Sequence, residues 1–175
     1  MQVGAVLPSS RALAKTMLSK IDFERPGYLI ELGGGTGSFT KAILDMGFDP
    51  KKLVVIERNP TFVTLLKKQF PNSLILQADA QNLKTVLQAH NINPIQINAI
   101  LSGIPLRSLP MLVLINILNN VREVLPRKSV FIQFTYGLRT PVPPDLLSSS
   151  DFRIQRSHRV WKNIPPAKVW LYEKK

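Results

Sequence analysis

Four residues early in the chain combine the types and the spacing of a small-molecule site. Glu31 ends an aliphatic run, and Gly33, Gly35 and Gly37 follow at alternate positions before a helix expected from Ser38. Backbone can approach a ligand closely where no Cβ intervenes, so a strand, a glycine turn and a helix start indicate a binding turn. The dinucleotide fingerprint requires glycines at the first, third and sixth positions. Counted from Gly33 or from Gly35, the sixth position is not a glycine, so the dinucleotide fingerprint is absent.

Two further acids end the next two predicted strands at distances that suit the same ligand. Glu57 stands 22 residues after Gly35, where an acid can accept hydrogen bonds from two ribose hydroxyls. Asp79, followed by Ala80, ends the third predicted strand. Either acid alone would be an ordinary polar residue at a strand end. Three such features in one order favour a cofactor that contains a ribose.

The spacing E-x-G-x-G-x-G over residues 31–37 resembles motif I of the class I S-adenosylmethionine (SAM) methyltransferases. This resemblance implies that SAM is the cofactor and that its methionine part, which carries no pyrophosphate, lies at the glycine turn. An Asp at the position of Asp79 resembles the residue that meets the adenine amino group in that class. The cofactor-binding residues implied are Glu31, Gly33, Gly35, Gly37, Glu57, Asp79 and Ala80.

The elements that must carry these residues alternate between strand and helix. Strands are expected over 28–32, 52–57, 73–79, 96–102 and 129–136. Helices are expected over 38–46, 60–70, 81–90 and 108–125. After a Pro- and Ser-rich loop, a hairpin is expected from two strands over 152–161 and 168–173. We therefore predict the α/β fold of the class I methyltransferases, a Rossmann-like sandwich with a seven-stranded, mostly parallel sheet, an antiparallel last strand and helices on both faces.

The same pattern predicts one domain over residues 1–175. Within it we expect an N-terminal helix in 1–22, a SAM-binding core over 27–136 and a terminal β-hairpin over 151–175. A chain of this length can bury one substantial core. Its 45% hydrophobic and 19% charged residues are typical of a folded globule.

Composition excludes several other kinds of site. The chain has no cysteine, which rules out disulfides, a thiolate nucleophile and a thiolate metal site. Its two histidines are far apart, so no metal site is expected. The N-terminus lacks the layout of a signal peptide, and the longest apolar stretch, over 111–118, is too short to span a bilayer. We therefore expect a cytoplasmic protein.

The chain is strongly basic. Lys and Arg number 23 against 11 Asp and Glu, which gives a net charge of +12. In the last 25 residues seven basic residues stand against two acidic ones, so this segment supplies +5. A polyanionic partner is expected, either nucleic acid or an anionic membrane surface, and charge alone does not decide between them.

The methyl acceptor is expected between the ends of the fourth and fifth strands, since ligands in open α/β sheets lie beyond the carboxyl ends of the strands. Ser102 and Tyr136 supply hydroxyl groups there, and we predict them as the catalytic residues. Methyl transfer from a sulfonium needs an aligned lone pair and exclusion of water more than a strong base. The predicted substrate-binding residues are Gly103, Ile104, Pro105, Arg107 and Arg139.

A further resemblance narrows the acceptor. Motifs of the bacterial phospholipid N-methyltransferases (phosphatidylethanolamine N-methyltransferases) resemble four segments of this chain, in order: 4–10, 102–106, 133–137 and 163–167. That family methylates phosphatidylethanolamine stepwise towards phosphatidylcholine. The resemblance implies a lipid amine facing Ser102 and Tyr136, with an anionic membrane as partner. From charge and position we add that Arg107 or Arg139 would meet the lipid phosphate.

Membrane attachment is the point where the chain departs from that family. Its members usually carry an amphipathic segment before the first motif, and three residues precede the motif here. Such a helix would lie in the membrane interface. Two alternatives stay open, a truncated chain or attachment through the basic surface alone, to which each residue contributes on the order of 1 kcal/mol. The expected place is peripheral, on the inner membrane face.

The competing interpretation is an rRNA adenine dimethyltransferase, whose core shares this sheet. In its related motif, Asn-Ile/Leu-Pro-Tyr, the Asn amide binds the adenine amino group and the Tyr ring stacks on the flipped base. This chain has Ser102 and Leu106 at those positions, so both base-reading groups are missing. We rank RNA second as the substrate, and a protein that binds SAM without catalysis third.

Overall fold

The computed structural model describes residues 11–136, 140–143, 146–147, 151–156 and 167–175. In these residues a sheet is formed by β1 (Tyr28–Leu32), β2 (Leu53–Glu57), β3 (Leu74–Gln77), β4 (Ile97–Ser102), β5 (Val130–Thr135), β6 (Phe152–Arg156) and β7 (Lys168–Lys174). The α-helices are α1 (Arg11–Leu18), α2 (Ser38–Asp45), α3 (Pro60–Gln69), α4 (Leu83–Ala89) and α5 (Met111–Val124). Short 3₁₀ turns are η1 (Pro50–Lys52), η2 (Ala80–Asn82), η3 (Pro94–Gln96) and η4 (Leu106–Ser108).

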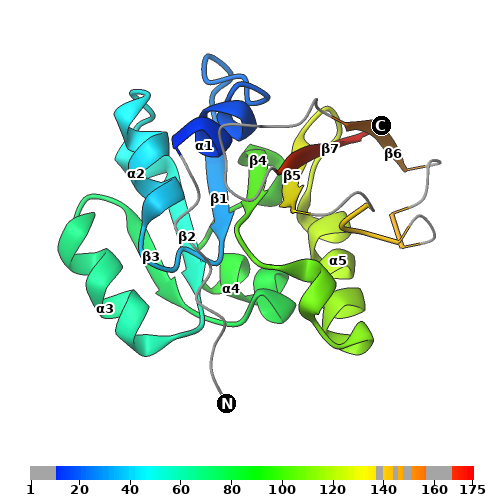
Figure 1. Cartoon of the computed structure of the whole chain (residues 1–175). Coiled ribbons are helices and arrows are strands. Elements are labelled where there is room, and N and C mark those ends of the chain that lie inside the picture. The colour runs from blue at the N-terminus through cyan, green and yellow to red at the C-terminus, as the bar shows by residue number, and fades with distance from the viewer. Residues whose placement is uncertain (1–10, 137–139, 144–145, 148–150, 157–166) are drawn as a thin grey trace.

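The strands lie in the order β3-β2-β1-β4-β5-β7-β6 (Figure 1). Neighbours among β1 to β5 pair in parallel, and β7 is antiparallel to both of its neighbours, β5 and β6. The predicted fold class is therefore confirmed, including the last strand inserted in the antiparallel direction.

Helices cover both faces of the sheet, which explains why its central strands are apolar along nearly their whole length. Successive side chains of a strand point to opposite faces. Ile30 and Leu32 belong to the core that includes α4 and α5, whereas Leu29 belongs to the core that includes α1, α2 and α3. The site must therefore form at an edge of the sheet, because both faces are filled.

The start of α3 follows the local sequence as predicted. The Asn59 side chain accepts the N–H of Thr61 at 2.9 Å and caps the helix, and Pro60 takes the first helical position. This is the place in a helix where a missing N–H costs nothing. The capping residues fix where the chain turns away from the end of β2.

Three predicted boundaries differ from the structure by two residues or more. The helix expected from residue 108 begins at Met111, because Pro110 keeps the preceding Leu109 extended. The third strand ends at Gln77, and η2 precedes the helix expected over 81–90, because Asp79 caps that 3₁₀ turn. The sixth strand is described to Arg156, and the rest of the segment predicted to Trp161 lies outside the described residues.

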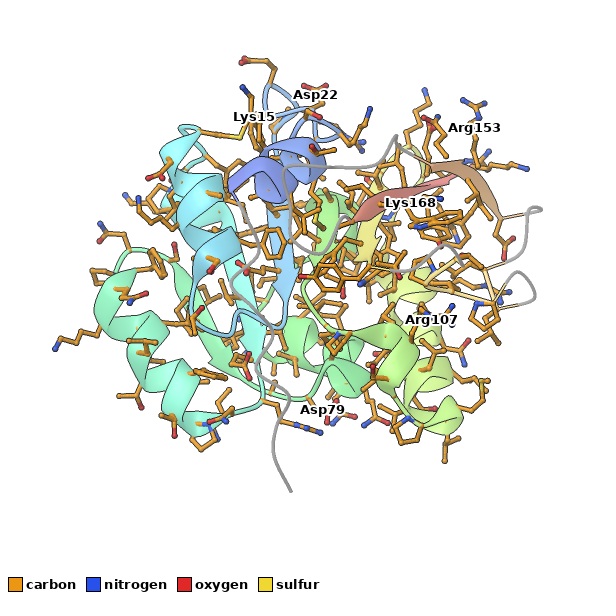
Figure 2. The ribbon with its side chains drawn as sticks, viewed as in Figure 1. Lys15, Asp22, Asp79, Arg107, Arg153 and Lys168 are labelled. Atoms are coloured by element: carbon orange, nitrogen blue, oxygen red, sulfur yellow. The ribbon has the colours of Figure 1, made fainter. Side chains whose placement is uncertain are left out.

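Parallel strands bring their carboxyl ends to one edge of the sheet. We define the carboxyl edge as residues 33–38, 57–60, 78–82, 102–110 and 136. The opposite amino edge consists of the segments before β1, β2, β4 and β5 and the helix ends that lead into them. Figure 2 shows Asp79 and Arg107 toward the carboxyl edge, and Lys15 and Asp22 at the other end of the molecule.

Candidate active site

The glycine turn after β1 adopts a backbone that requires its glycines. Gly33, Gly35 and Gly37 have φ angles of 78°, 52° and 86°, which is the left-handed region. Side chains with a Cβ rarely adopt this region, so the alternate spacing predicted from the sequence reflects alternate left-handed residues. The Gly33 N–H donates to Ile56 O at 2.8 Å, which holds the turn against the end of β2.

The space beside Gly35 is open. A Cβ built on this residue would have no heavy atom within 4 Å, whereas one on Gly33 would lie 2.8 Å from the Ile104 side chain. The turn thus combines a closed side toward β4 with an open side where a ligand can approach the backbone. The residues present fit the methionine part of SAM.

Glu57 connects the turn to the end of β2. Its Oε2 accepts the N–H of Gly35 at 2.9 Å, and its Oε1 accepts the N–H of Asn59 at 2.7 Å. Each carboxylate oxygen keeps a further lone pair, so the side chain can still accept hydroxyl hydrogens. This geometry suits the predicted ribose contact, which stays a prediction.

Glu31 lies beneath the turn, fully buried on the α2 side of the sheet. Its Oε2 accepts the hydroxyl of Thr40 at 2.7 Å, and its Oε1 has no hydrogen-bond partner among the described residues. Burial raises the pKa of Glu31 from 4.5 to about 8, and the charge of Glu57 adds to the rise. The unpartnered Oε1 is a buried polar atom at the cofactor turn, as expected if a bound group completes its hydrogen bonding.

We predict that replacing Glu31 by Gln removes a pH dependence of stability. The folded state of the natural chain keeps the Glu31 proton up to about pH 8, whereas the unfolded state loses it above about 4.5. The free energy of unfolding therefore falls as pH rises through this window, by up to about 1.4 kcal/mol per pH unit. Urea unfolding without SAM should show a flatter profile for Glu31→Gln. Equal slopes in the two proteins would contradict the burial argument.

Asp79 and Ala80 lie at the end of β3. The Asp79 Oδ1 accepts the N–H of Gln81 at 2.9 Å, and its Oδ2 is 3.8 Å from a guanidinium nitrogen of Arg58. Ala80 is buried. The carboxylate thus caps η2 and leaves Oδ2 in a loose ion pair, accessible to a ligand at the carboxyl edge.

Two asparagines of α5 hold this segment, a role the sequence analysis did not predict. Asn120 donates to Gln81 O at 2.7 Å, and Asn116 donates to the Gln81 side chain at 3.1 Å. Asn120 also accepts the N–H of Lys84 at 2.9 Å. Their spacing of four residues in an otherwise apolar helix is the sequence feature that could have revealed them.

The acceptor loop, residues 102–106 at the end of β4, touches the glycine turn directly. The Gly103 N–H donates to Leu32 O at 2.8 Å, and a Cβ on Gly103 would lie 2.8 Å from Gly33 O. Ser102 is fully buried, and its hydroxyl accepts the N–H of Ile104 at 3.3 Å. The structure therefore brings the predicted cofactor and acceptor segments together, with Ser102 inside the loop rather than at its surface.

Gln133 supports this loop from β5 and was not assigned a role from the sequence. It pairs opposite Ser102 in the sheet register, and its side-chain amide donates to Ile104 O at 2.9 Å and Phe134 O at 3.0 Å. Gln133 is 1% exposed, and its Oε1 has no partner in the described part of the chain. A buried amide within an apolar strand is the sequence feature that points to such a positioning residue.

The remaining predicted acceptor residues differ in their surroundings. Tyr136 is 38% exposed and packs edge-on against Phe134, with ring centroids 5.3 Å apart. Arg107 is exposed and donates to Thr140 O at 3.0 Å. Pro105 leads from the loop into η4, and Arg139 lies outside the described residues. Tyr136 thus offers an accessible hydroxyl, and Arg107 an accessible cation.

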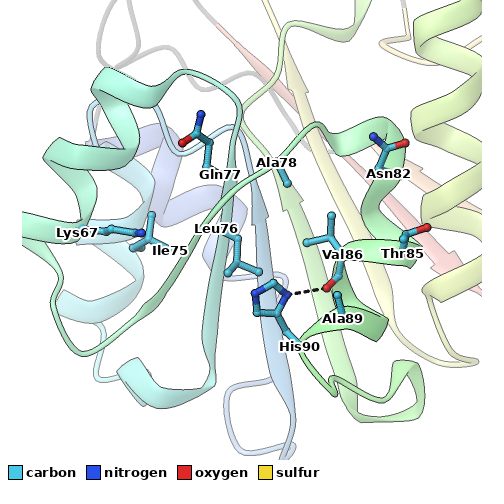
Figure 3. A pocket seen from close by; sticks show the side chains of 10 residues that line it. All are labelled: Lys67, Ile75, Leu76, Gln77, Ala78, Asn82, Thr85, Val86, Ala89 and His90. Carbon is cyan, nitrogen blue, oxygen red and sulfur yellow. Dashed lines mark hydrogen bonds between the residues drawn. The ribbon is translucent and has the colours of Figure 1, made fainter.

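A hollow of about 560 Å³ lies elsewhere, along the outer edge of the sheet (Figure 3). It is lined by β3 and α4, from Ile75 and Gln77 to His90, whose ring lies 2.9 Å from Val86 O. None of the predicted site residues lines it. In the described part of the chain, no three potential metal ligands cluster, and no helix is long and apolar enough to span a bilayer.

Comparison with known proteins places the chain among methyltransferases. Residues 8–124 match the family described as Ribosomal RNA adenine dimethylase. The ornithine lipid N-methyltransferase of Singulisphaera acidiphila is 32% identical over 136 residues, which cover 76% of this chain and 70% of that protein.

Solved structures share the fold at low identity. The precorrin-6y C5,15-methyltransferase of Geobacter metallireducens GS-15 has a TM-score of 0.70 at 16% identity, covering 99% of this chain and 93% of that chain. The 1,6-didemethyltoxoflavin-N1-methyltransferase of Burkholderia thailandensis, solved with S-adenosylhomocysteine, has a TM-score of 0.67 at 15% identity, covering 93% and 76%.

The family match covers more than half of the chain, and the fold and the open glycine turn agree with it. The predictions of an enzyme and of SAM as its cofactor are therefore confirmed. The chain belongs to the ribosomal RNA adenine dimethylase family of class I SAM-dependent methyltransferases.

Proposed function

We propose that this enzyme transfers a methyl group from SAM to the amine of a membrane lipid headgroup, with phosphatidylethanolamine or its methylated forms as the substrate. The observation that carries the proposal is the acceptor loop, which has Ser102 and Leu106 at the positions where a base-reading site has an amide and an aromatic ring. The ornithine lipid N-methyltransferase relative supports the lipid class. Both lipids named here present an amine near an anionic group.

In this proposal the cofactor residues act as the sequence predicts. The glycine turn receives the methionine part of SAM, Glu57 binds the ribose hydroxyls, and Asp79 with Ala80 meets the adenine. SAM, when bound, supplies the methyl group on a sulfonium. The contact between Gly33 and Gly103 sets how closely the acceptor loop lies to the turn.

The acceptor residues align the amine and exclude water from it. Gln133 fixes the carbonyl of Ile104, and Ser102 fixes the N–H of the same residue. We propose that the loop so held, together with the Tyr136 hydroxyl, orients the nitrogen lone pair in line with the transferred methyl. A cation, Arg107 or Arg139, would pair with the lipid phosphate, since four of the five guanidinium N–H donors of Arg107 have no described partner.

We predict that Tyr136→Phe lowers turnover about tenfold, the effect of losing one hydrogen bond of about 1.4 kcal/mol. The ring keeps its packing on Phe134, so SAM affinity should not change. Tyr28→Phe is the matched control, because Tyr28 lies at the start of β1 on the amino edge. Steady-state kinetics and SAM titration check both variants, and unchanged turnover in Tyr136→Phe would remove its hydroxyl from the acceptor site.

RNA is the second candidate substrate, favoured by the family match over 8–124 and by the net charge of +12. An assay with tritiated-methyl SAM distinguishes the candidates. It would offer, in parallel, anionic vesicles with phosphatidylethanolamine, vesicles with ornithine lipid, and protein-depleted small-subunit rRNA. We expect label in the lipid extract, and the two vesicle arms identify the headgroup. Label in RNA alone would overturn the proposal.

A further inference from the structure

The carboxyl edge carries exposed apolar side chains next to the acceptor loop. Met111 and Leu112 open α5 directly after this loop and are 59% and 70% exposed. Single exposed apolar residues are ordinary on protein surfaces. Two large neighbours on the edge that holds the site need a physical reason, because each leaves its apolar area in water.

The first turn of α5 packs on the core through Val113 and Leu114, and Met111 and Leu112 lie on its solvent side. Asn116 and Asn120 bind Gln81 of η2, which fixes the helix at their level. Met111 is about 7.5 Å farther along the helix axis than Asn116, at a rise of about 1.5 Å per residue. The two exposed side chains therefore stand at the outer rim of the carboxyl edge.

Acidic side chains are distributed unequally between the two edges, whereas described Lys and Arg side chains lie at both. The described acidic side chains that reach solvent at or toward the amino edge are Asp22, Glu24, Asp45, Asp49, Glu123, Asp151 and Glu173. Four of them pair with Lys or Arg within 4 Å. At the carboxyl edge Asp79 is partly exposed, while Glu31 and Glu57 are buried.

Arg107 is the cation nearest in sequence to the exposed pair. It donates to a backbone carbonyl, and no carboxylate of the described residues lies within 4 Å of it. Figure 2 shows it beside α5, away from Lys15 and Asp22. Its positive charge is therefore available to an anionic partner at the same rim.

Aliphatic side chains beside cations match the interface of an anionic bilayer, where the apolar groups enter the acyl boundary and the cations meet phosphates. A single-stranded nucleic acid would instead select stacking rings along a basic groove. We propose that Met111 and Leu112 insert into an anionic bilayer while Arg107 meets its phosphates, which turns the acceptor loop toward the membrane. This inference rests on the proposed function, since the bilayer is where a lipid amine is found.

The test uses the full chain and vesicles of phosphatidylglycerol and phosphatidylethanolamine, in cosedimentation without SAM. The double variant Met111→Ser/Leu112→Ser should lower the partition coefficient about tenfold, because burial of aliphatic area contributes to interfacial binding. Ile95→Ser is the matched control, since Ile95 is 74% exposed in η3 at the amino edge. Circular dichroism and thermal unfolding verify that each variant is folded.

Three results would overturn the docking surface: no vesicle binding by the natural chain, no change in the double variant, or an equal loss in Ile95→Ser. A second assay separates this surface from the proposed function. Methyl transfer to short-chain phosphatidylethanolamine, dispersed as monomers, should be the same in the natural chain and the double variant, while transfer to vesicles falls. Vesicle binding without transfer to either lipid form would overturn the proposed function and leave the docking surface supported.

Discussion

Replacing Gly103 by alanine is expected to lower the rate of methyl transfer about 100-fold, the loss that a misplacement near 1 Å can cause at a reacting centre. The added Cβ would lie 2.8 Å from Gly33 O, and a backbone oxygen cannot move without its chain. The acceptor loop and the cofactor turn must separate, although neither loses a functional side chain.

Single-turnover kinetics with saturating SAM would measure this effect. Gly47→Ala is the control, because Gly47 also has a positive φ, of 87°, but a Cβ there would meet nothing within 4 Å. That variant should lose about 1–2 kcal/mol of stability from its left-handed backbone and keep its transfer rate. Full activity in a folded Gly103→Ala protein would show that the contact between the two turns does not set the transfer distance.

Replacing Glu57 by alanine is expected to weaken SAM binding about 100-fold, or about 3 kcal/mol. The variant loses the carboxylate predicted to bind two ribose hydroxyls and also the bond that holds the Gly35 N–H. Both losses act on the same ligand, so the effect exceeds that of one neutral hydrogen bond.

Isothermal titration with SAM and with S-adenosylhomocysteine would measure the affinity. Asp45→Ala is the matched control, because Asp45 is an exposed carboxylate at the end of α2 whose partner is Lys41. The chain should stay folded in both variants. SAM affinity equal to that of the natural chain in Glu57→Ala would make the assignment at the end of β2 wrong.

The parts of the site that sequence could predict are those set by local chemistry. A left-handed backbone needs glycine, so Gly33, Gly35 and Gly37 reveal the turn without knowledge of its neighbours. The start of α3 could also be predicted locally, because Asn59 caps the helix and Pro60 takes its first position. The alternation of apolar runs and helices predicted a mostly parallel sheet, for which few topologies exist.

The parts that sequence could not predict depend on partners far along the chain. Gln133 acts on Ile104, 29 residues earlier, and Asn120 acts on Gln81, 39 residues earlier. No local sequence pattern predicts a hydrogen-bond partner at such a distance along the chain. The raised pKa of Glu31 likewise follows from burial under α2. The domain limits and the roles of the site residues, Arg139 included, stay predictions.

The position of β7 has a consequence for how the protein forms during synthesis. β5 has β7 as its outer neighbour, and β6 has β7 as its one partner in the described sheet. While the ribosome makes the chain, β1 to β5 can pair first, but the outer side of β5 stays unpaired until β7 emerges. An open strand edge invites pairing with another nascent chain. Shortening the chain before Lys168 would make that exposure permanent, so truncated products should aggregate even though every predicted cofactor residue is present.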